Sequence, residues 1–331
     1  MNAEEVLLLT PRDVAGLLTI DDCIGAVEQA FRLYGEGKAI PPGVLSMHMG
    51  DGGFHVKAGV LDVGRHYFAA KVNGNFPENP ARFGLPTIQG VIVLCDARKG
   101  NPLAVMDSRD VTSLRTAAAT AVAAKHLARS DSRILTICGC GNQGRVQAVA
   151  ISRVCRLQRV FTYDTSAEQA ERLAQELAAE LRIPVTAVSD LATGVQQSDI
   201  CVTCTTSRQP ILALGDVSPG TFIAAVGADN PEKQEIHPGL MANSKIVADI
   251  LEQCAVMGDL HHAIVAGVVE RADVHAELGE IVAAKKTGRA SDEEIVVFDS
   301  TGMALQDVAV AAFVYEKAGR QASGVRLNFA A

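Results

Sequence analysis

Three glycines in the stretch TICGCGNQGRVQ, residues 136–147, have the spacing of a loop that binds phosphate. Gly139, Gly141 and Gly144 follow a short apolar run and precede a segment with helical periodicity. Glycine adopts positive φ and has no Cβ, so the chain can approach a ligand closely, and the N-terminus of a helix attracts an anion. The motif is short, and an ordinary strand-to-helix turn is the alternative interpretation.

An acidic residue at the expected distance favours a dinucleotide. Asp164 ends the next predicted strand, 20 residues after Gly144, where a carboxylate accepts hydrogen bonds from the adenosine ribose. No arginine follows in YDTSAEQ, which favours NAD and leaves NADP open. The predicted cofactor-binding set is completed by two loop residues and by two threonines after a later strand: Asn142, Gln143, Thr205 and Thr206.

The elements around this loop predict a Rossmann-type α/β domain. From about residue 133, strand-like and helix-like segments alternate, which implies a doubly wound parallel sheet with helices on both faces. Strands are predicted at 133–139, 159–164, 199–207, 222–229, 245–250 and 294–302. Helices are predicted at 142–155, 166–181 and 259–269.

The N-terminal part predicts a second, mixed α+β domain for substrate binding and dimerisation. Its expected elements are two helices within 10–38 and antiparallel strands at 52–61, 65–76 and 90–107.

Two further helices connect the domains. An alanine-rich one at 113–130 leads into the nucleotide domain, and one at 305–319 crosses back. We therefore expect one domain from residues 1–115 with a C-terminal helix at about 304–331, and the dinucleotide-binding domain from 116–303.

The amino-acid composition restricts the classes of binding partner and the cellular compartment to be expected for this protein. The chain has 331 residues, 48% of them hydrophobic, which suits about two globular domains. Its 30 Lys+Arg against 38 Asp+Glu give a formal charge of −8, which argues against nucleic acid and anionic membranes as partners. The sequence lacks an apolar run of 18 residues and a signal-peptide pattern. We expect a cytoplasmic protein.

The cysteines and histidines predict no metal site. The eight cysteines are scattered, as in a reduced protein. Cys201 and Cys204 form a C-x-x-C, but it lies in a strand-like run and no second pair follows at zinc spacing. His48, His55 and His66 lack the spacing of metal ligands.

Six blocks, in the same order and over nearly the whole chain, resemble the ornithine cyclodeaminase/mu-crystallin family. They are KVNGNFPENP, GLPTIQGVIVLCDARKGNPLAVMDS, LRTAAATAVAAKHLAR, CGCGNQGR, GADNPEKQE and FDSTGMALQD. The family includes ornithine and lysine cyclodeaminases, alanine dehydrogenases and reductases of cyclic or linear imino acids. The resemblance implies a nicotinamide cofactor, an amino or imino acid substrate and a homodimer formed through the first domain.

The resemblance also implies roles for two cations. Lys71 in AAKVNGN matches the family lysine beside the substrate carboxylate, and Arg115 in SLRTAAA matches its arginine partner. A guanidinium grips a carboxylate through two parallel hydrogen bonds, and an ammonium adds a compact charge. Solvated surface cations, or a salt bridge, are the alternative interpretation of both residues.

Asp229 in VGADNPEKQE matches the family's catalytic aspartate. With Lys71 it forms the predicted catalytic set, and its carboxyl group is expected to exchange a proton with the substrate nitrogen. The alternative is a helix N-cap for the following PEKQEI. Lys233 and Glu235 are expected to shape the loop.

One position departs from the family pattern. Many relatives carry an arginine after the early prolines, where AIPPGVLSMHM offers Gly43. Lys57 in FHVKAGVL lies on the next predicted strand and is a candidate replacement in substrate binding, although a solvated strand lysine is the simpler interpretation.

The leading functional prediction is NAD(P)H-dependent reduction of an α-imino acid, cyclic such as 1-pyrroline-2-carboxylate or linear, or the reverse amino-acid dehydrogenase reaction. The alternative is ornithine cyclodeaminase, which forms proline and ammonia without net cofactor turnover. A third is a catalytically silent cofactor-binding protein of mu-crystallin type. The sequence leaves the choice of imino acid open.

Overall fold

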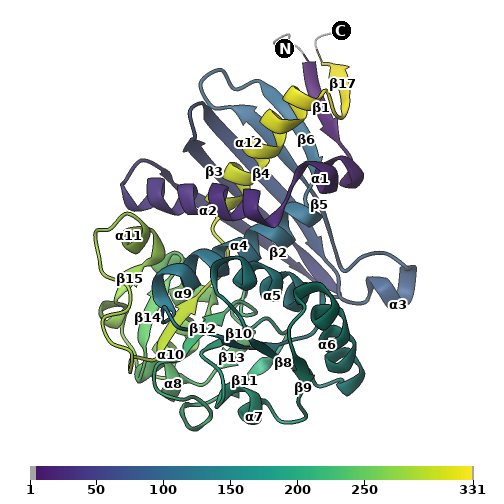
Figure 1. Cartoon of the computed structure of the whole chain (residues 1–331). Helices are drawn as coiled ribbons and strands as arrows, with labels where there is room; N and C mark the ends of the chain where they lie inside the picture. Colours follow the sequence, from purple (N-terminus) through teal and green to yellow (C-terminus); the bar gives the residue numbers. More distant parts are fainter. Residues whose placement is uncertain (1–4, 330–331) are drawn as a thin grey trace. The chain divides into compact units, whose positions relative to one another are not determined.

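The computed structural model describes residues 5–329 and divides the chain into two compact units (Figure 1). The first comprises Met1–Arg115 and Met303–Ala331, and the second comprises Thr116–Gly302. The first unit is thus built from both ends of the chain.

The second unit contains an eight-stranded parallel sheet, which confirms the predicted α/β class. The strand order is β15-β14-β16-β12-β10-β7-β8-β9. The strands are β7 (Ile134–Cys138), β8 (Arg159–Tyr163), β9 (Val185–Ala187), β10 (Ile200–Thr203), β12 (Phe222–Ala225), β14 (Lys245–Ala248), β15 (Ala276–Glu277) and β16 (Val296–Asp299). Two short strands, β11 (Arg208–Leu212) and β13 (Gln234–Ile236), pair separately.

Helices connect these strands. The helical segments are α5 (Asn142–Val154), α6 (Ala167–Leu181), α7 (Leu191–Val195), α8 (Pro238–Ala242), α9 (Leu251–Met257), α10 (Asp259–Val265), α11 (Leu278–Val282), η1 (Leu214–Asp216) and η2 (Arg271–Asp273). Helix α6 shows why the sequence forms them. Ser166 caps its first turn by accepting from the Gln169 amide at 3.3 Å, and Leu173 and Leu177 lie on its buried face.

The strand order reverses direction next to β7. The chain runs from β7 outward to β8 and β9, then returns to β10 on the other side of β7. The carboxyl ends align there, because Cys138 pairs with Thr203, and Thr203 pairs with Ala225. Ligands of open parallel sheets bind outside the carboxyl ends at such a reversal.

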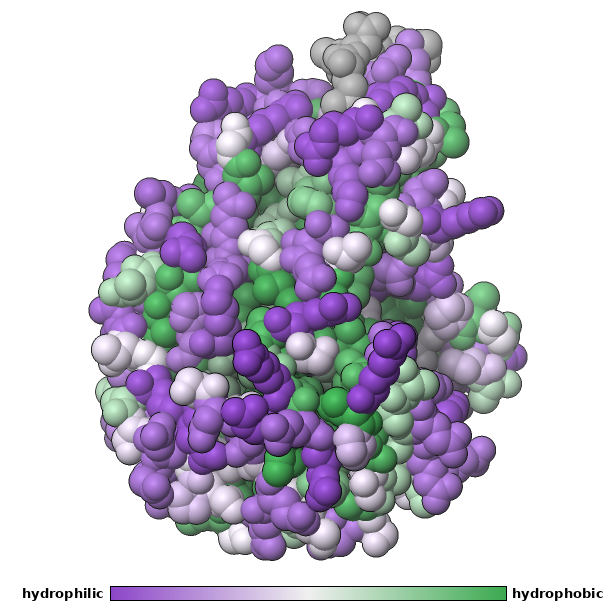
Figure 2. All heavy atoms as spheres, in the orientation of Figure 1, coloured by the Kyte–Doolittle hydropathy of each residue, from purple (hydrophilic) through white to green (hydrophobic). Residues whose placement is uncertain are grey.

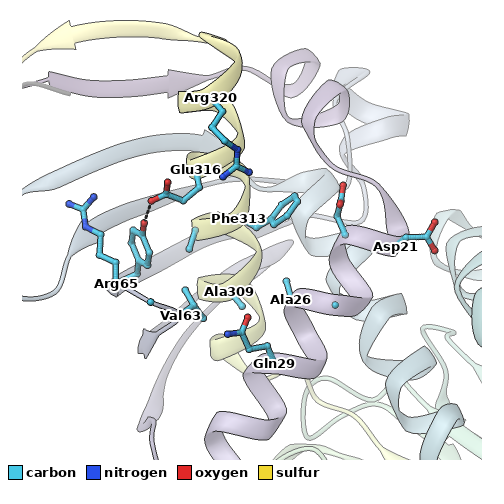
Figure 3. Close-up of a pocket in the computed structure, with 14 residues that line it drawn as sticks. Asp21, Ala26, Gln29, Val63, Arg65, Ala309, Phe313, Glu316 and Arg320 are labelled. Carbon is cyan, nitrogen blue, oxygen red and sulfur yellow. Dashed lines mark hydrogen bonds between the residues drawn. The ribbon is translucent and has the colours of Figure 1, made fainter.

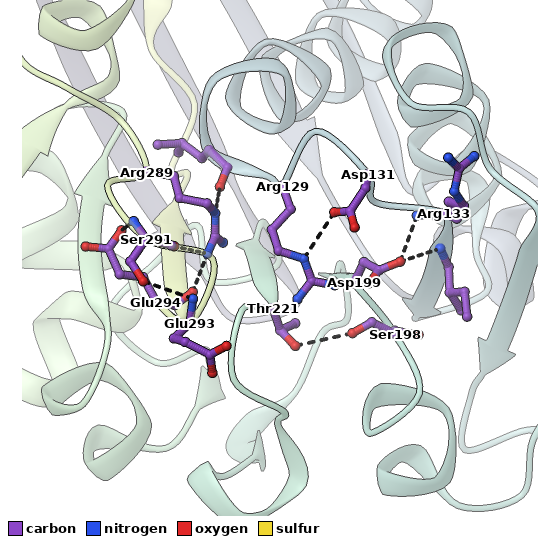
Figure 4. Close-up of polar contacts among 12 residues, drawn as sticks. Arg129, Asp131, Arg133, Ser198, Asp199, Thr221, Arg289, Ser291, Glu293 and Glu294 are labelled. Atoms are coloured by element: carbon purple, nitrogen blue, oxygen red, sulfur yellow. Dashed lines mark hydrogen bonds and ion pairs between the residues drawn. The ribbon is translucent and has the colours of Figure 1, made fainter.

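A polar cluster lies at the opposite, amino ends of these strands (Figure 4). Arg129, just after α4 (Arg109–Leu127), forms an ion pair with Asp199, which also accepts from the Arg133 amide at 2.7 Å. Arg289 donates from Nε to the Leu127 carbonyl at 2.8 Å. These groups join the end of a helix to the start of β7 and β10, so their role in the fold is structural.

The first unit contains a seven-stranded mixed sheet in the order β17-β1-β6-β5-β4-β3-β2. Its strands are β1 (Glu5–Leu9), β2 (Ile40–Met49), β3 (Gly52–Asp62), β4 (His66–Asn75), β5 (Ile88–Asp96), β6 (Pro102–Asp107) and β17 (Val325–Asn328). The expectation of antiparallel strands is incomplete, because β1 pairs with β6 in parallel. Strand β2 was not predicted, and its two prolines are tolerated because it is an edge strand.

Two helices of this unit begin at side-chain caps. The unit contains α1 (Pro11–Leu17), α2 (Ile20–Gly35), α3 (Asn79–Phe83) and α12 (Ala304–Gln321), and α4 (Arg109–Leu127) starts here as well. Capping boxes at Thr10 and Thr19 start α1 and α2. Helix α12 packs on β3 and β4 (Figure 1). Gly59 permits this contact, because a Cβ there would lie 2.9 Å from Leu305.

Within residues 5–329 no helix combines the length and apolarity needed to cross a membrane. Hydrophilic side chains dominate the face of the molecule shown in Figure 2, with apolar atoms in smaller areas.

Candidate functional site

The glycine loop of the second unit has the geometry of a dinucleotide cradle. It joins β7 to α5 beside the reversal in strand order. Gly139 has φ +101°, and a Cβ on Gly144 would lie 2.2 Å from the Gly139 carbonyl oxygen, so both positions require glycine. Gly141 is the N-cap of α5, has no side-chain cap and faces open space. The first amides of α5 are therefore available to a phosphate group.

Asp164 follows β8 and supports the same loop. Its Oδ2 accepts from the Cys140 amide at 2.8 Å, and its Oδ1 accepts from the Ser166 amide at 3.0 Å. The carboxylate is half-buried, next to the glycine loop. The residues of this region fit an adenosine diphosphate with a free ribose hydroxyl pair.

Glu235 holds two loops at the carboxyl edge of the sheet. This carboxylate is fully buried and accepts from the Thr205 amide at 2.6 Å, the Gly227 amide at 2.7 Å and the Thr203 hydroxyl at 2.8 Å. Burial raises its pKa, while these hydrogen bonds act in the opposite direction. The Thr205 amide donates to this carboxylate instead of to a neighbouring strand, and β10 ends at Thr203, short of the predicted residue 207.

Asp229 lies in the loop after β12, four residues beyond the last strand residue, Ala225. Its side chain is 48% exposed and pairs with Lys233 Nζ at 2.7 Å. The N-cap interpretation is wrong, since the residues that follow form a turn and then β13, not a helix. The carboxylate therefore reaches the surface of the loop, where it is paired with Lys233.

Lys71 and Arg115, by contrast, are buried in the first unit around one carboxylate. Lys71 Nζ lies 2.9 Å from Asp307 Oδ1, and Arg115 Nε lies 3.1 Å from the same oxygen. Arg115 also donates from Nη1 to Gln306 Oε1 at 3.0 Å. The second oxygen of Asp307 and the amide nitrogen of Gln306 are buried without a hydrogen-bond partner among the described residues. The interpretation of solvated surface cations is therefore wrong for both, and they form a buried salt bridge.

This cluster places two cations, Lys71 and Arg115, around the single carboxylate of Asp307. Lys71 is only 3% exposed. Burial and the neighbouring Arg115 lower the pKa of Lys71 to about 7, although Asp307 acts in the other direction. Burial alone raises the pKa of Asp307, but Lys71 and Arg115 outweigh it and the net pKa is lowered. A cluster with this imbalance favours an anionic ligand.

Lys57 belongs to the same face of the sheet. It pairs directly with Lys71 across β3 and β4, and its charge contributes to lowering the pKa of Lys71. Gly43 pairs with Ala58, so a side chain at position 43 lies on the other face. Val44, which pairs with Lys57, is the residue of β2 that faces the cations.

Three residues of this arrangement were missed by sequence reasoning as site residues. Asp307 and Gln306 lie in the block FDSTGMALQD, and Glu235 lies in GADNPEKQE, where it was expected only to shape the loop. Both blocks carried a family signal, but the partners of these residues are remote in sequence. Asp307 is 236 residues from Lys71.

Other candidate features do not converge on these groups. All eight cysteines are free; Cys201 is buried in β10, while Cys204 follows that strand and is partly buried. Among the described residues no cluster of three metal-ligating side chains occurs. A cavity of about 730 Å³ lies between α2, α12 and the β3–β4 turn (Figure 3). Its polar groups pair locally, as Glu316 does with Tyr67, and it contains none of the predicted site residues.

Comparison with known proteins defines the family. The sequence model of the ornithine cyclodeaminase/mu-crystallin family matches residues 4–322, and the chain belongs to this family. It is 40% identical over 325 residues to alanine dehydrogenase of Archaeoglobus fulgidus, covering 98% of this chain and 99% of the relative. It is 35% identical over 321 residues to iminosuccinate reductase of Paracoccus denitrificans, covering 95% and 97%.

Solved structures agree with this assignment. A dimeric archaeal alanine dehydrogenase with bound NAD superposes with a TM-score of 0.94 at 39% identity, covering 98% of this chain and 99% of that one. The Δ1-pyrroline-2-carboxylate reductase of Thermococcus litoralis, in complex with NADH and L-proline, gives a TM-score of 0.92 at 33% identity, covering 97% and 99%. The predicted family and fold class are both confirmed.

Proposed function

We propose that this protein is an NAD-dependent oxidoreductase that reduces an α-imino acid to the corresponding L-amino acid, or catalyses the reverse reaction. The observation that carries the proposal is the buried cluster of Lys71, Arg115 and Asp307, in a chain that also contains a dinucleotide cradle. Its relatives include an alanine dehydrogenase, pyrroline-2-carboxylate reductases and an iminosuccinate reductase.

In this proposal the second unit is the dinucleotide-binding domain. The amides of Gly141, Asn142 and Gln143 would hold the pyrophosphate, and Asp164 would accept hydrogen bonds from the ribose hydroxyls. Thr205 and Thr206 follow β10 at the same carboxyl edge, and they would complete the cofactor-binding set. When bound, the nicotinamide supplies hydride to the carbon of the C=N group.

The remaining residues bind the substrate and move its proton. Arg115 and Lys71 bind the substrate carboxylate, and Lys57 extends the positive face. Asp229 gives a proton to the imino nitrogen, so the carbon gains hydride and the nitrogen gains a proton. Lys71, whose pKa is near 7, is the second group able to carry a proton at neutral pH.

Measurement of NADH consumption tests this function directly. Absorbance is followed with 1-pyrroline-2-carboxylate and with linear imino acids generated from 2-oxo acids and ammonium. Consumption supports a reductase, whereas ammonia release from L-ornithine with no net change in NADH identifies a cyclodeaminase. Tight NADH binding without turnover of either substrate class identifies a silent cofactor-binding protein.

We further propose that the protein is a homodimer formed through the first unit. The sheet face away from α12 carries exposed apolar side chains on four neighbouring strands: Leu45, Met47, Phe54, Val72 and Val91. Contiguous apolar patches of this kind mark protein interfaces. Light scattering should give about twice the chain mass of 34.8 kDa, and Val72→Asp should shift the protein toward the monomer. A monomeric wild type would refute the proposal.

A further inference from the structure

The buried carboxylate of Glu235 closes the loop that carries Asp229. Its Oε2 accepts from the Gly227 amide at 2.7 Å, eight positions earlier in the sequence. Within the loop closed by this bond, the Gly227 carbonyl accepts from the Asp229 amide at 3.1 Å, and Asp229 pairs with Lys233 Nζ at 2.7 Å. The backbone position of Asp229 therefore depends on the contact between Gly227 and Glu235.

The same carboxylate fixes the loop after β10. Its Oε1 accepts from the Thr205 amide at 2.6 Å, and its Oε2 also accepts from the Thr203 hydroxyl at 2.8 Å. Thr203 is the last residue of β10, and Thr205 belongs to the predicted cofactor-binding set. One side chain thus joins the loop assigned to the cofactor and the loop assigned to proton transfer, which follow different strands, β10 and β12.

The close approach of these two loops requires glycine at position 227. A Cβ there would lie 2.5 Å from Glu235 Cδ and 2.5 Å from the Thr205 carbonyl oxygen, far inside van der Waals contact. Gly227 does not have a positive φ, so its backbone conformation is open to other residues. The carboxylate contact, and not the backbone, therefore explains this glycine.

Buried contacts hold Glu235 itself in place. Asp259 Oδ1, at the start of α10, accepts from the Glu235 and Ile236 amides, both at 2.8 Å. Asp299, the last residue of β16, accepts in turn from the Leu260 amide at 2.9 Å. Glu235, Asp259 and Asp299 are all fully buried, so this support belongs to the core of the second unit.

Resting on the proposed function, we propose that Glu235 is a positioning residue that sets the relation between the cofactor and Asp229. It acts through the backbone of Thr205 and Gly227 and exchanges no proton with the substrate. Backbone amides can only donate, so both carboxylate oxygens have to accept. Loss of either acceptor releases one loop, and loss of both separates the proton donor from the cofactor.

The test is a double-mutant cycle between Glu235→Met and Asp229→Ala. NADH consumption is followed with 1-pyrroline-2-carboxylate or iminopyruvate, whichever the wild type reduces faster, and circular dichroism checks folding. Glu235→Met keeps the length of the side chain and removes both acceptors, so kcat should fall by about tenfold or more. In the Asp229→Ala background the same change should lower kcat by less than about twofold, because the released loop no longer carries the acid.

Two further variants separate positioning from a general effect on stability. Glu235→Gln retains one acceptor oxygen, so its kcat should lie between those of the wild type and Glu235→Met. Glu294→Met is the matched control, because Glu294 accepts from the Ala290 and Ser291 amides at 2.8 and 3.3 Å ahead of the amino end of β16. It should keep the kcat and the Kd for NADH of the wild type, whereas Glu235→Met should raise that Kd severalfold by fluorescence titration.

The outcomes distinguish failure of the inference from failure of the proposed function. Wild-type kcat in Glu235→Met, or a loss that multiplies fully with that of Asp229→Ala, overturns the inference while the oxidoreductase function stands. A wild type that reduces neither imino acid refutes the proposed function itself. Where Glu235→Met does not fold, Gly227→Ala takes its place in the cycle with the same expected outcomes, since its Cβ displaces the carboxylate.

Discussion

Replacement of Asp307 by asparagine should destabilise the protein, because this carboxylate is the shared partner of two buried cations. The change keeps the shape of the side chain and removes its charge. Lys71 Nζ and Arg115 Nε, at 2.9 and 3.1 Å from Asp307 Oδ1, then lose the negative charge that offsets their burial. Removing one partner of a buried ion pair costs about 3–5 kcal/mol, and the lower part of that range applies where Lys71 can release its proton.

The control for Asp307→Asn is Asp51→Asn in the same unit. Asp51 pairs with Arg82 at 2.8 Å, but the two side chains are 68% and 51% exposed. Such surface pairs contribute about 0–1 kcal/mol, so this variant should unfold close to the wild type. The comparison removes the general effect of an Asp-to-Asn change and leaves the effect of burial.

Chemical denaturation, followed by circular dichroism and by activity, measures both variants. Asp307→Asn should also raise KM, because loss of Asp307 lowers the pKa of Lys71 further and leaves less ammonium to bind substrate. A saturating carboxylate ligand should recover part of the lost stability, since it replaces the missing charge. Equal stability of Asp307→Asn and Asp51→Asn would refute this account of the cluster.

Three further outcomes test the remaining assignments. Asp164→Arg should weaken NADH binding and improve NADPH binding, since it removes the ribose acceptor and supplies a cation for the 2′-phosphate; unchanged cofactor affinities by fluorescence titration would show that the adenosine site is misplaced. Arg115→Ala should raise KM more than tenfold, since losing a buried charged partner costs about 2–5 kcal/mol of binding free energy. Asp229→Ala should instead lower kcat by a factor of roughly 10² to 10⁴. Near-wild-type turnover by Asp229→Ala would rule out a role of Asp229 in proton transfer. The charged form of Lys71, which lies among Arg115, Asp307 and Lys57, is lost as pH rises through about 7. The kcat/KM of the wild type should therefore fall across that pH range, whereas the kcat/KM of Lys71→Met should not. Identical pH profiles of the two proteins would assign the titration to another group.

The sequence alone determined the family and the architecture of the second unit. Three features carried this prediction: the glycine spacing, the alternation of strand and helix, and the acidic residue after the second strand. Each depends on residues close together in the sequence, through backbone conformation or hydrophobic periodicity, so the sequence shows it directly. Gly139 and Gly144 illustrate this, because positive φ and close approach of the backbone admit only glycine there. The segment that became β2 was missed because its two prolines resemble a loop, and only the edge position in the sheet makes them compatible with a strand.

Only the tertiary structure showed what the site residues contact. Lys71 and Asp307 are 236 residues apart, and Arg115 and Gln306 are 191 apart, so no local pattern links them. The register of β3 and β4 decided that Lys57 stands beside Lys71, and that position 43 faces the other side. Folding brings these groups together, so the buried ion pairs of Asp307 with Lys71 and Arg115 are a property of the folded chain that its sequence does not display.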